Sequence, residues 1–312
     1  MKNNERMIVR IIKEICTDEA INFTSFSYDW ILRLEKDNKS GFIYGYNFGI
    51  NNASAAKICD DKCAVSDVLI QYGIPTAVHY LFMSPENIGY IGQSGSWGNI
   101  TKLFDKYTNL VCKANEGTGG AAVFLVKNKL QLEAAVHKIF KQNRTMAVSP
   151  YYNILKEYRA IVLDGKVKLA YAKNIPYVVG DGKRDLRNIF LEYMAANNIL
   201  LNLEIEDEVL DKVLQQGEKY NINWKSNLCQ GAVPEIVKDE KLLSELSNLS
   251  LKAAKALSID FASVDIIITN EGMKVLEVNC GIMMENFIRS TPENYDIAKQ
   301  IYTQAVRKMI YS

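Results

Sequence analysis

Apolar residues change their spacing along the chain, from helical to strand-like and back. Isoleucines recur every three or four residues in the first segment, which predicts an amphipathic helix. Large apolar residues then alternate with polar ones on both sides of an Asp-Asn-Lys-Ser-Gly turn, a pattern typical of a β-hairpin. Asp60 is placed to cap a third segment, which Gly73 and Pro75 end. These predicted elements are a helix over 4–16, a hairpin over 30–44 and a helix over 61–72.

The rest of the chain continues to mix strand and helix patterns and contains no internal repeat. The middle part predicts strands over 76–83, 109–114, 121–127 and 145–149 and helices over 99–107 and 130–142. Hairpins over 156–177 and 261–279 follow, with helices over 185–197, 207–219, 239–257 and 293–310. This mixture indicates an α+β protein. Pro150 is a natural hinge, and we predict three subdomains, at 1–75, 76–150 and 151–312.

Composition argues against several classes of protein. The chain has 37 Lys and Arg residues and 36 Asp and Glu residues, so its net charge of +1 creates no field that would attract nucleic acid or an anionic membrane. Charged residues interrupt the N-terminal apolar segment, and no stretch reaches the roughly 18 uninterrupted apolar residues of a membrane span. We therefore expect a cytoplasmic protein with no nucleic-acid or membrane partner.

The six cysteines and two histidines form no recognisable site. Cys59 and Cys63 lie one helical turn apart, but no second pair of ligands completes a zinc site, so reduced and buried thiols are expected. His79 falls in a predicted strand and His137 in a predicted helix, and neither has a serine or cysteine partner nearby. A histidine-dependent hydrolase is therefore not expected.

A glycine-rich loop follows a lysine at the end of the strand predicted over 109–114. The loop reads Lys113-Ala-Asn-Glu-Gly117-Thr118-Gly119-Gly120. Glycines let backbone N–H groups approach phosphate oxygens, and the lysine adds a positive charge. The alternatives are a plain turn between two strands and a dinucleotide-binding motif, Gly-x-Gly-x-x-Ala. That motif opens a helix, whereas residues 123–126 predict a strand, and no P-loop motif is present.

Oxygen ligands gather on the last predicted hairpin. Glu277 and Asn279 are two residues apart on one strand, so their side chains leave the same face. Because the turn lies at 270–272, Asp265 should pair with Glu277 on the facing strand. Buried carboxylates need a partner or a metal, and hard oxygen ligands suit Mg²⁺. The alternative is an ordinary polar face of an exposed hairpin.

Two basic residues lie on the hairpin before it. Arg159 enters a strand that otherwise predicts core, where a guanidinium needs an anionic partner. Lys173 lies on the facing strand. Taken singly, either could be a solvated charge. A polar loop around Asn227 follows a predicted helix and by itself indicates little.

In this order, the segments resemble the ATP-grasp superfamily over about residues 55–290. The likeness rests on Asp61-Lys62 with Gly-Ile-Pro-Thr at 73–76, the loop 113–120, Val-Ser-Pro-Tyr at 148–151, Glu157-x-Arg159, and Asp265 with Glu277-x-Asn279. Val-Gly-Asp-Gly-Lys at 179–183 and Leu-Glu-Val-Asn at 276–279 are most similar to the ATP-grasp domain of cyanophycin synthetase and related amino-acid ligases. Glutathione synthetase and D-alanine–D-alanine ligase are more distant likenesses. The resemblance implies three subdomains that hold the nucleotide between two β-sheets.

The resemblance also implies roles for individual residues. It assigns ATP to Lys62, Lys113, Gly117, Thr118, Gly119, Gly120, Val148, Ser149, Tyr151 and Lys173. It assigns Mg²⁺, or Mn²⁺, to Asp265, Glu277 and Asn279, and the acyl phosphate to Arg159, with Asn227 and Gly281 as further candidates for substrate contact. The expected protein is a homo-oligomeric ligase that joins the carboxylate of an amino acid or peptide to an amine and releases ADP and phosphate.

Several departures from the family pattern limit what the resemblance implies. Ala114 follows the lid lysine where the family usually has proline, and the hinge lacks the usual Glu-rich run. Cys280 and Gly281 replace the more familiar Pro-Gly after Asn279. Two alternatives remain at this stage, a small-molecule kinase with the same fold and a nucleotide-binding module without catalysis. The intact Asp265, Glu277 and Asn279 set with Arg159 disfavours the second.

Overall fold

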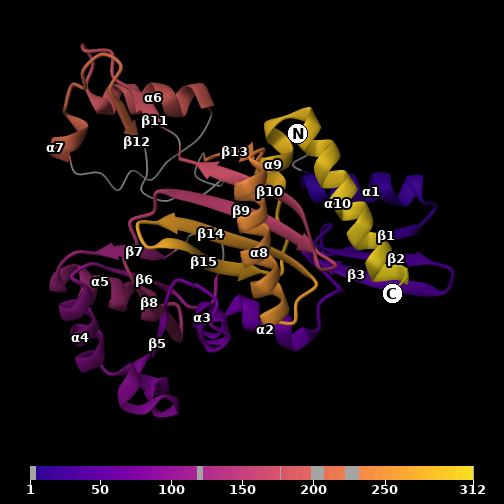
Figure 1. The fold of residues 1–312 in the computed structure, drawn as a ribbon, viewed down its shortest axis with the longest axis horizontal. Coiled ribbons are helices and arrows are strands. Elements are labelled where there is room, and N and C mark those ends of the chain that lie inside the picture. Colours follow the sequence, from indigo (N-terminus) through magenta and orange to yellow (C-terminus); the bar gives the residue numbers. More distant parts are fainter. Residues whose placement is uncertain (1–4, 118–121, 176, 198–206, 222–231, 312) are drawn as a thin grey trace.

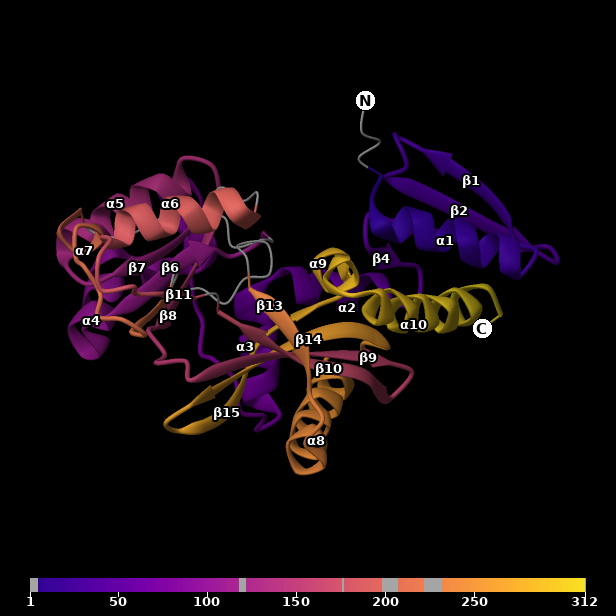
Figure 2. The same ribbon diagram turned by 90° about the horizontal axis from the view of Figure 1, so that it is seen from above.

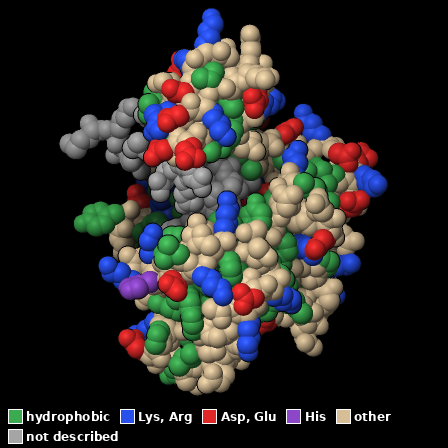
Figure 3. Space-filling view, turned by 90° about the vertical axis from the view of Figure 1, so that its left-hand side faces the viewer, with side chains coloured by type: hydrophobic (Ala, Val, Ile, Leu, Met, Phe, Trp, Pro, Cys, Tyr) green, Lys and Arg blue, Asp and Glu red, His purple; other side chains and the backbone are tan. Residues whose placement is uncertain are grey.

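The computed structural model describes residues 5–117, 122–175, 177–197, 207–221 and 232–311. Three larger antiparallel sheets, a two-stranded one and their covering helices make up the described residues (Figure 1). Within the described residues, no helix is both long enough and apolar enough to cross a membrane. Side chains of both charge signs are interspersed over the face shown in Figure 3.

The N-terminal part is a four-stranded sheet with a helix on one face. Helix α1 (Met7–Asp18) is followed by β1 (Asn22–Phe26), β2 (Ile31–Lys36), β3 (Lys39–Tyr44) and β4 (Asn47–Phe48), which pair in that order. The predicted helix and the predicted hairpin are both confirmed, while β1 and β4 were not predicted. Helices α2 (Ala53–Asp60) and α3 (Lys62–Gln71) lead into the next part. The N-cap of α3 is Asp61, which accepts a hydrogen bond from the Ala64 N–H, so the expected cap at Asp60 was wrong by one residue.

The middle part is a second four-stranded antiparallel sheet, in the order β5-β8-β6-β7. Its elements are β5 (Tyr80–Met83), two short 3-10 helices (Pro85–Tyr90 and Gly92–Gly95), α4 (Trp97–Tyr107), β6 (Leu110–Ala114), β7 (Val123–Val126), α5 (Lys129–Phe140) and β8 (Thr145–Pro150). Helices α4 and α5 bury their apolar faces against this sheet. The strand predicted over 76–83 begins only at Tyr80, because Thr76 instead bridges Val275 of the third sheet.

The C-terminal part holds a five-stranded antiparallel sheet, in the order β13-β10-β9-β14-β15. Its strands are β9 (Lys156–Leu163), β10 (Lys166–Asn174), β13 (Val233–Ile236), β14 (Phe261–Thr269) and β15 (Gly272–Asn279), and α8 (Glu240–Ala256) covers one face. A small unit of β11 (Tyr177–Val179), α6 (Leu186–Asn197), α7 (Asp207–Leu210) and β12 (Lys219–Asn221) has its own core. The helix predicted over 207–219 therefore ends at Leu210, since the chain is needed for the β11–β12 pair.

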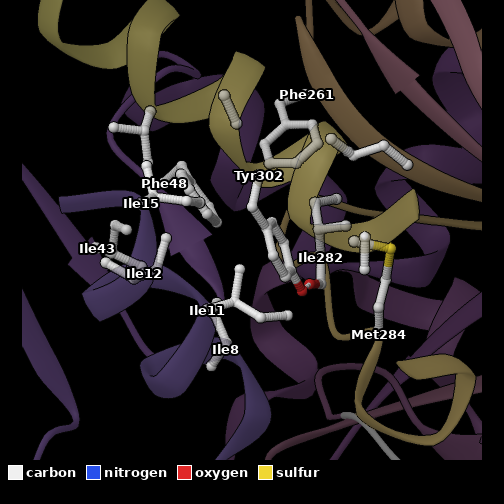
Figure 4. Packing of buried hydrophobic residues seen from close by; sticks show 14 of the residues in the cluster. Ile8, Ile11, Ile12, Ile15, Ile43, Phe48, Phe261, Ile282, Met284 and Tyr302 are labelled. Carbon is white, nitrogen blue, oxygen red and sulfur yellow. Dashed lines mark hydrogen bonds between the residues drawn. The ribbon is translucent and has the colours of Figure 1, made fainter. Parts of the chain in front are cut away.

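The two ends of the chain share one hydrophobic core. Helices α9 (Glu285–Ser290) and α10 (Pro292–Tyr311) close the chain, and α10 packs beside α1 under the N-terminal sheet (Figure 2). Tyr302 of α10 stacks on Phe48 with ring centroids 5.5 Å apart, next to the isoleucines of α1 (Figure 4). The Tyr302 hydroxyl donates to the Ile282 carbonyl at 2.7 Å. This packing holds the segment after β15 in place, directly behind the site described next.

Candidate active site

A row of polar side chains crosses the five-stranded sheet. In the strand register Tyr171 of β10 faces Arg159 of β9, Arg159 faces Asp265 of β14, and Asp265 faces Glu277 of β15. Directly opposed residues in antiparallel strands project from the same face. The predicted pairing of Asp265 with Glu277 is thus confirmed, and Arg159 joins the same row.

Arg159 and Asp265 of this row form a buried ionic cluster with two further side chains, Lys173 and Glu157. Arg159 donates from Nε and Nη2 to the two carboxylate oxygens of Asp265, each at 2.7 Å. Lys173 Nζ lies 2.8 Å from Asp265 Oδ2 and 2.5 Å from Glu157 Oε1. The Asp265 side chain is 2% exposed and that of Arg159 15%, so only the guanidinium of this pair still reaches open space. The cluster can therefore offer positive charge to a ligand.

Burial and pairing act against each other on the pKa values of this cluster. Burial disfavours ionised Asp265, but Arg159 and Lys173 outweigh it and hold the pKa of that carboxyl well below its usual range. For Glu157, burial dominates and raises the pKa in spite of Lys173. The pKa of Arg159 stays well above its usual value, since burial is outweighed by Asp265. Asp265 is thus the firmly ionised member that balances the two cations.

This cluster revises two expectations. Arg159 was expected to owe its place in an apolar strand to a bound anion, and its partner is instead the cross-strand carboxylate of Asp265. Lys173 was expected to reach a nucleotide phosphate, and here it bonds to Glu157 and Asp265. Glu157 had been given no role. The sequence signal for Glu157 was its two-residue spacing from Arg159, which places both side chains on the same face of the strand.

A pocket of about 210 Å³ lies where the middle sheet meets the five-stranded sheet. Lys62 and Gly117 line one side, and Glu277 and Asn279 line the other. Lys62 Nζ donates to the Gly117 carbonyl at 2.9 Å and to the Asn115 carbonyl at 3.1 Å, so α3 holds the start of the glycine-rich loop. The structure thus brings together a loop and a hairpin that are far apart in sequence.

Lys113 is buried beside this pocket. Burial lowers its pKa to about 8, Glu277 opposes the shift and Lys62 adds to it. Glu277 of β15 therefore acts electrostatically on Lys113 of β6, although the two strands belong to different sheets. A lysine in this position is charged at neutral pH and only weakly compensated, which suits it to an anionic ligand.

The predicted metal ligands partly fit a hard cation. Glu277 and Asn279 line the pocket with oxygen-bearing side chains, and Asn279 Nδ2 donates to Glu277 Oε1 at 3.1 Å, which fixes the amide orientation. Both oxygens of Asp265 are taken by cations. No group of three or more His, Cys, Asp or Glu side chains suited to a metal occurs among the residues that the structure describes. Mg²⁺ needs only one or two protein carboxylates when phosphates complete its shell.

The other predicted site residues divide into three groups. Thr118, Gly119 and Gly120 lie outside the described residues, as does Asn227. Val148 and Ser149 are buried in β8, Val148 within the core shared with α4 and α5, while Tyr151 after the strand is exposed. Gly281 forms a β-bridge with Asn47 of the N-terminal sheet.

Comparison with known proteins adds to this geometry. Residues 189–304 match the model of the RimK-like ATP-grasp domain. The chain is 28% identical over 175 residues to the tetrahydromethanopterin:alpha-L-glutamate ligase of Methanocaldococcus jannaschii, covering 56% of this chain and 46% of that protein. It is 23% identical over 248 residues to the cyanophycin synthetase of Trichormus variabilis, covering 72% of this chain and 26% of that protein. The chain thus spans less than half the length of these curated relatives.

Solved structures show the same fold at low identity. A bifunctional glutathione synthetase from Pasteurella multocida superposes with a TM-score of 0.56 at 15% identity, covering 96% of this chain and 44% of that one. D-alanine–D-alanine ligase from Bacillus anthracis gives 0.54 at 18% identity, covering 83% and 68%. The expected α+β fold with antiparallel sheets is confirmed as the ATP-grasp fold, and residues 189–304 are similar to the RimK-like ATP-grasp domain.

Proposed function

We propose that the chain is an ATP-dependent carboxylate–amine ligase. The observation that carries the proposal is the pocket in which Lys62 from beside the middle sheet meets Glu277 and Asn279 of the other sheet. The Lys62 ammonium shares this pocket with the side-chain oxygens of Asp60, Glu116, Glu277 and Asn279, a set that fits a nucleotide triphosphate when its metal ion is bound with it. The ligase relatives named above support the same reading.

In this proposal the nucleotide lies between the two sheets. Lys62 and Lys113 contact its phosphates, Gly117–Gly120 cover them, and the backbone of residues 148–151 meets the adenine. Lys113 supports this placement because it is buried, only partly balanced by Glu277, and still charged below its pKa of about 8. Lys173 pairs with the carboxylates of Glu157 and Asp265. In this proposal it keeps Asp265 ionised and does not contact a phosphate.

Glu277 and Asn279 would hold the magnesium ion, with Asp265 as the neighbouring carboxylate. When bound, Mg²⁺ neutralises charge on the transferred phosphate. The protein's own contribution to this part of the site is orientation, since Asn279 is fixed by its hydrogen bond to Glu277 and Asp265 by Arg159.

The proposed reaction has two steps. A carboxylate oxygen of the donor attacks the γ-phosphorus of ATP, the bond to the bridging β,γ-oxygen breaks, and ADP leaves behind an acyl phosphate. The amine nitrogen then attacks the acyl carbon, the carbon–oxygen bond to phosphate breaks, and the amine loses a proton as the amide forms. Arg159 lies in the same cross-strand row as Glu277, which lines the pocket, and in this proposal its partly exposed guanidinium stabilises the negative charge that develops in both steps. Exclusion of water by the loop would protect the intermediate.

The proposed substrates are amino acids or short peptides, in line with the glutamate ligase and cyanophycin synthetase relatives. The test is to incubate the purified chain with MgATP and pooled amino acids, and to measure phosphate release and new masses. A donor labelled with ¹⁸O in its carboxylate should pass one ¹⁸O atom to the released phosphate. A phosphorylated product without free phosphate would identify a kinase, and unchanged ATP would leave only a binding module.

A further inference from the structure

The first residue after β6, Asn115, is completely buried at the start of the glycine-rich loop. It follows Lys113 by two residues and precedes Gly117 by two. Its backbone N–H donates to the carbonyl of Thr145 in β8 at 3.3 Å, so the residue is fixed to the middle sheet. The ligase mechanism proposed above gives Asn115 no role, although it lies within the segment that carries the proposed nucleotide site.

Asn115 also holds the N-terminus of α3. The first N–H groups of a helix have no partner inside the helix and need one elsewhere. The carboxamide Oδ1 of Asn115 accepts a hydrogen bond from the Cys63 N–H at 3.1 Å, and its backbone carbonyl accepts one from the Lys62 N–H at 3.4 Å. The cap residue Asp61 accepts the next one, from Ala64, at 2.8 Å. These three consecutive N–H groups therefore bind the loop and the cap and are not available to a phosphate.

The side chain of Lys62 reinforces this connection between α3 and the loop. Its Nζ donates to the carbonyls of Asn115 and Gly117, at 3.1 Å and 2.9 Å. Asp61 and Glu116 form a β-bridge beside it. An ammonium group has three N–H donors. Among the contacts of the described residues, two of them hold the loop, and the third remains for a phosphate in the pocket that Lys62 lines.

The type of side chain at position 115 matters as well. The Cys63 N–H needs an oxygen acceptor, which asparagine and aspartate supply equally well at the start of a helix. The Nδ2 of Asn115 is buried without a hydrogen-bond partner among the described residues, which costs free energy, and an aspartate would avoid that cost. An aspartate would, however, place a negative charge beside Lys62 and two residues from Lys113, and this charge would repel a phosphate. Asparagine is thus the acceptor that leaves the site positive.

We propose that Asn115 is a positioning residue for the nucleotide. Its side chain joins α3 to the glycine-rich loop, and it sets Lys62 relative to Lys113 without adding charge. Asn115 is fully buried and does not line the pocket, so it acts through Lys62 and Gly117 and touches no phosphate itself. This inference rests on the proposed function, because it takes the ligand of the pocket to be a nucleotide triphosphate.

Two variants separate the acceptor from the charge. In Asn115→Ala the acceptor is lost, so amide hydrogen exchange in a peptide covering residues 61–69 should become at least about tenfold faster. Its affinity for β,γ-imido-ATP with Mg²⁺, measured by calorimetry on the full chain, should fall at least about tenfold. Asn115→Asp keeps the acceptor, so exchange should stay within about twofold of the unmodified protein, while the added charge lowers the affinity at least about tenfold. A purely structural role would restore both properties in Asn115→Asp.

Asn128 gives the matched control. Its Oδ1 caps α5 by accepting a hydrogen bond from the Gln131 N–H at 2.8 Å, and it does not line the pocket. Asn128→Ala and Asn128→Asp should therefore leave the affinity for the nucleotide analogue unchanged.

Several outcomes would overturn the assignment of Asn115. It fails if Asn115→Ala leaves the exchange or the affinity unchanged, or if Asn115→Asp binds the analogue as tightly as the unmodified protein. Should Asn115→Ala not fold, Asn115→Asp decides by itself. If the unmodified protein does not bind the analogue, the proposed function fails and this assignment fails with it. If the unmodified protein binds and the Asn115 variants bind equally well, this assignment alone fails.

Discussion

Arg159 and Asp265 face each other across β9 and β14 and are joined by two hydrogen bonds of 2.7 Å. This bidentate pair is nearly buried, and Lys173 adds a third charge to it. Each carboxylate oxygen of Asp265 therefore has a cationic partner. The pair places the guanidinium in the same cross-strand row as Glu277, and it also stabilises the sheet that carries Glu277.

Replacing Arg159 with alanine should reduce both stability and turnover. Breaking a buried ion pair by removing one partner costs about 3 kcal/mol or more, although Lys173 still compensates Asp265 in part. Turnover should fall about a hundredfold if the guanidinium also stabilises the acyl phosphate. Urea unfolding and phosphate release on the same variant measure the two effects. Arg184→Ala, which breaks an exposed pair with Asp181, is the control and should change neither.

Arg159→Lys separates the two roles. It keeps the positive charge opposite Asp265 but removes the two-pronged geometry. We expect most of the stability to return while turnover remains low. A variant that recovers both would show that charge alone is needed, and one that recovers neither would make the guanidinium purely structural.

Nucleotide binding should weaken as the pH rises through about 8. Lys113 has its pKa lowered to about 8, so it is charged below that pH and neutral above it. Between pH 7 and pH 9 the affinity for ATP should fall about tenfold, because a neutral amine no longer attracts phosphate. Calorimetry across this range gives the profile. In Lys113→Arg the side chain cannot lose its proton, so the profile should flatten; an unchanged slope would assign the titration to another group.

Glu277→Gln should abolish turnover and leave the fold intact. Glu277 lines the pocket and orients Asn279, and losing its charge weakens the metal ion that the proposal places there. Phosphate release measures the loss, and circular dichroism checks the fold. Glu271→Gln, in the turn of the same hairpin, is the matched control because its carboxylate is exposed, pairs with Lys274 and does not line the pocket. Near-normal turnover in Glu277→Gln would contradict the metal assignment.

Lys62→Met should make the first residues of the glycine-rich loop more mobile. The Lys62 ammonium donates to the carbonyls of Asn115 and Gly117, and methionine has a similar length but no donor. Amide hydrogen exchange in a peptide covering residues 113–117 should become faster in the protein without nucleotide. Lys57→Met on the exposed face of α2 is the control. Equal exchange rates in Lys62→Met and Lys57→Met would show that Lys62 does not hold this segment in place.

The sequence alone predicted those features that depend on short spacing. Alternation around the turn at 270–272 predicted that Asp265 would face Glu277, and the register confirms it. Helical periodicity likewise predicted α1 and α10, and the strand that follows the glycine-rich loop argued correctly against a dinucleotide motif. Such features are local, because side-chain direction follows directly from the period of a strand or a helix.

Tertiary structure decided which of these local features meet. The sequence contains no signal that Arg159 would find its anion in Asp265, more than a hundred residues later, or that Lys173 would share it. Sheet order brought them together, and order depends on how whole strands bury their apolar faces. The same holds for Lys62 and Glu277, which line one pocket from distant parts of the chain. Spacing determines which way a side chain points, and packing between distant segments determines what it meets.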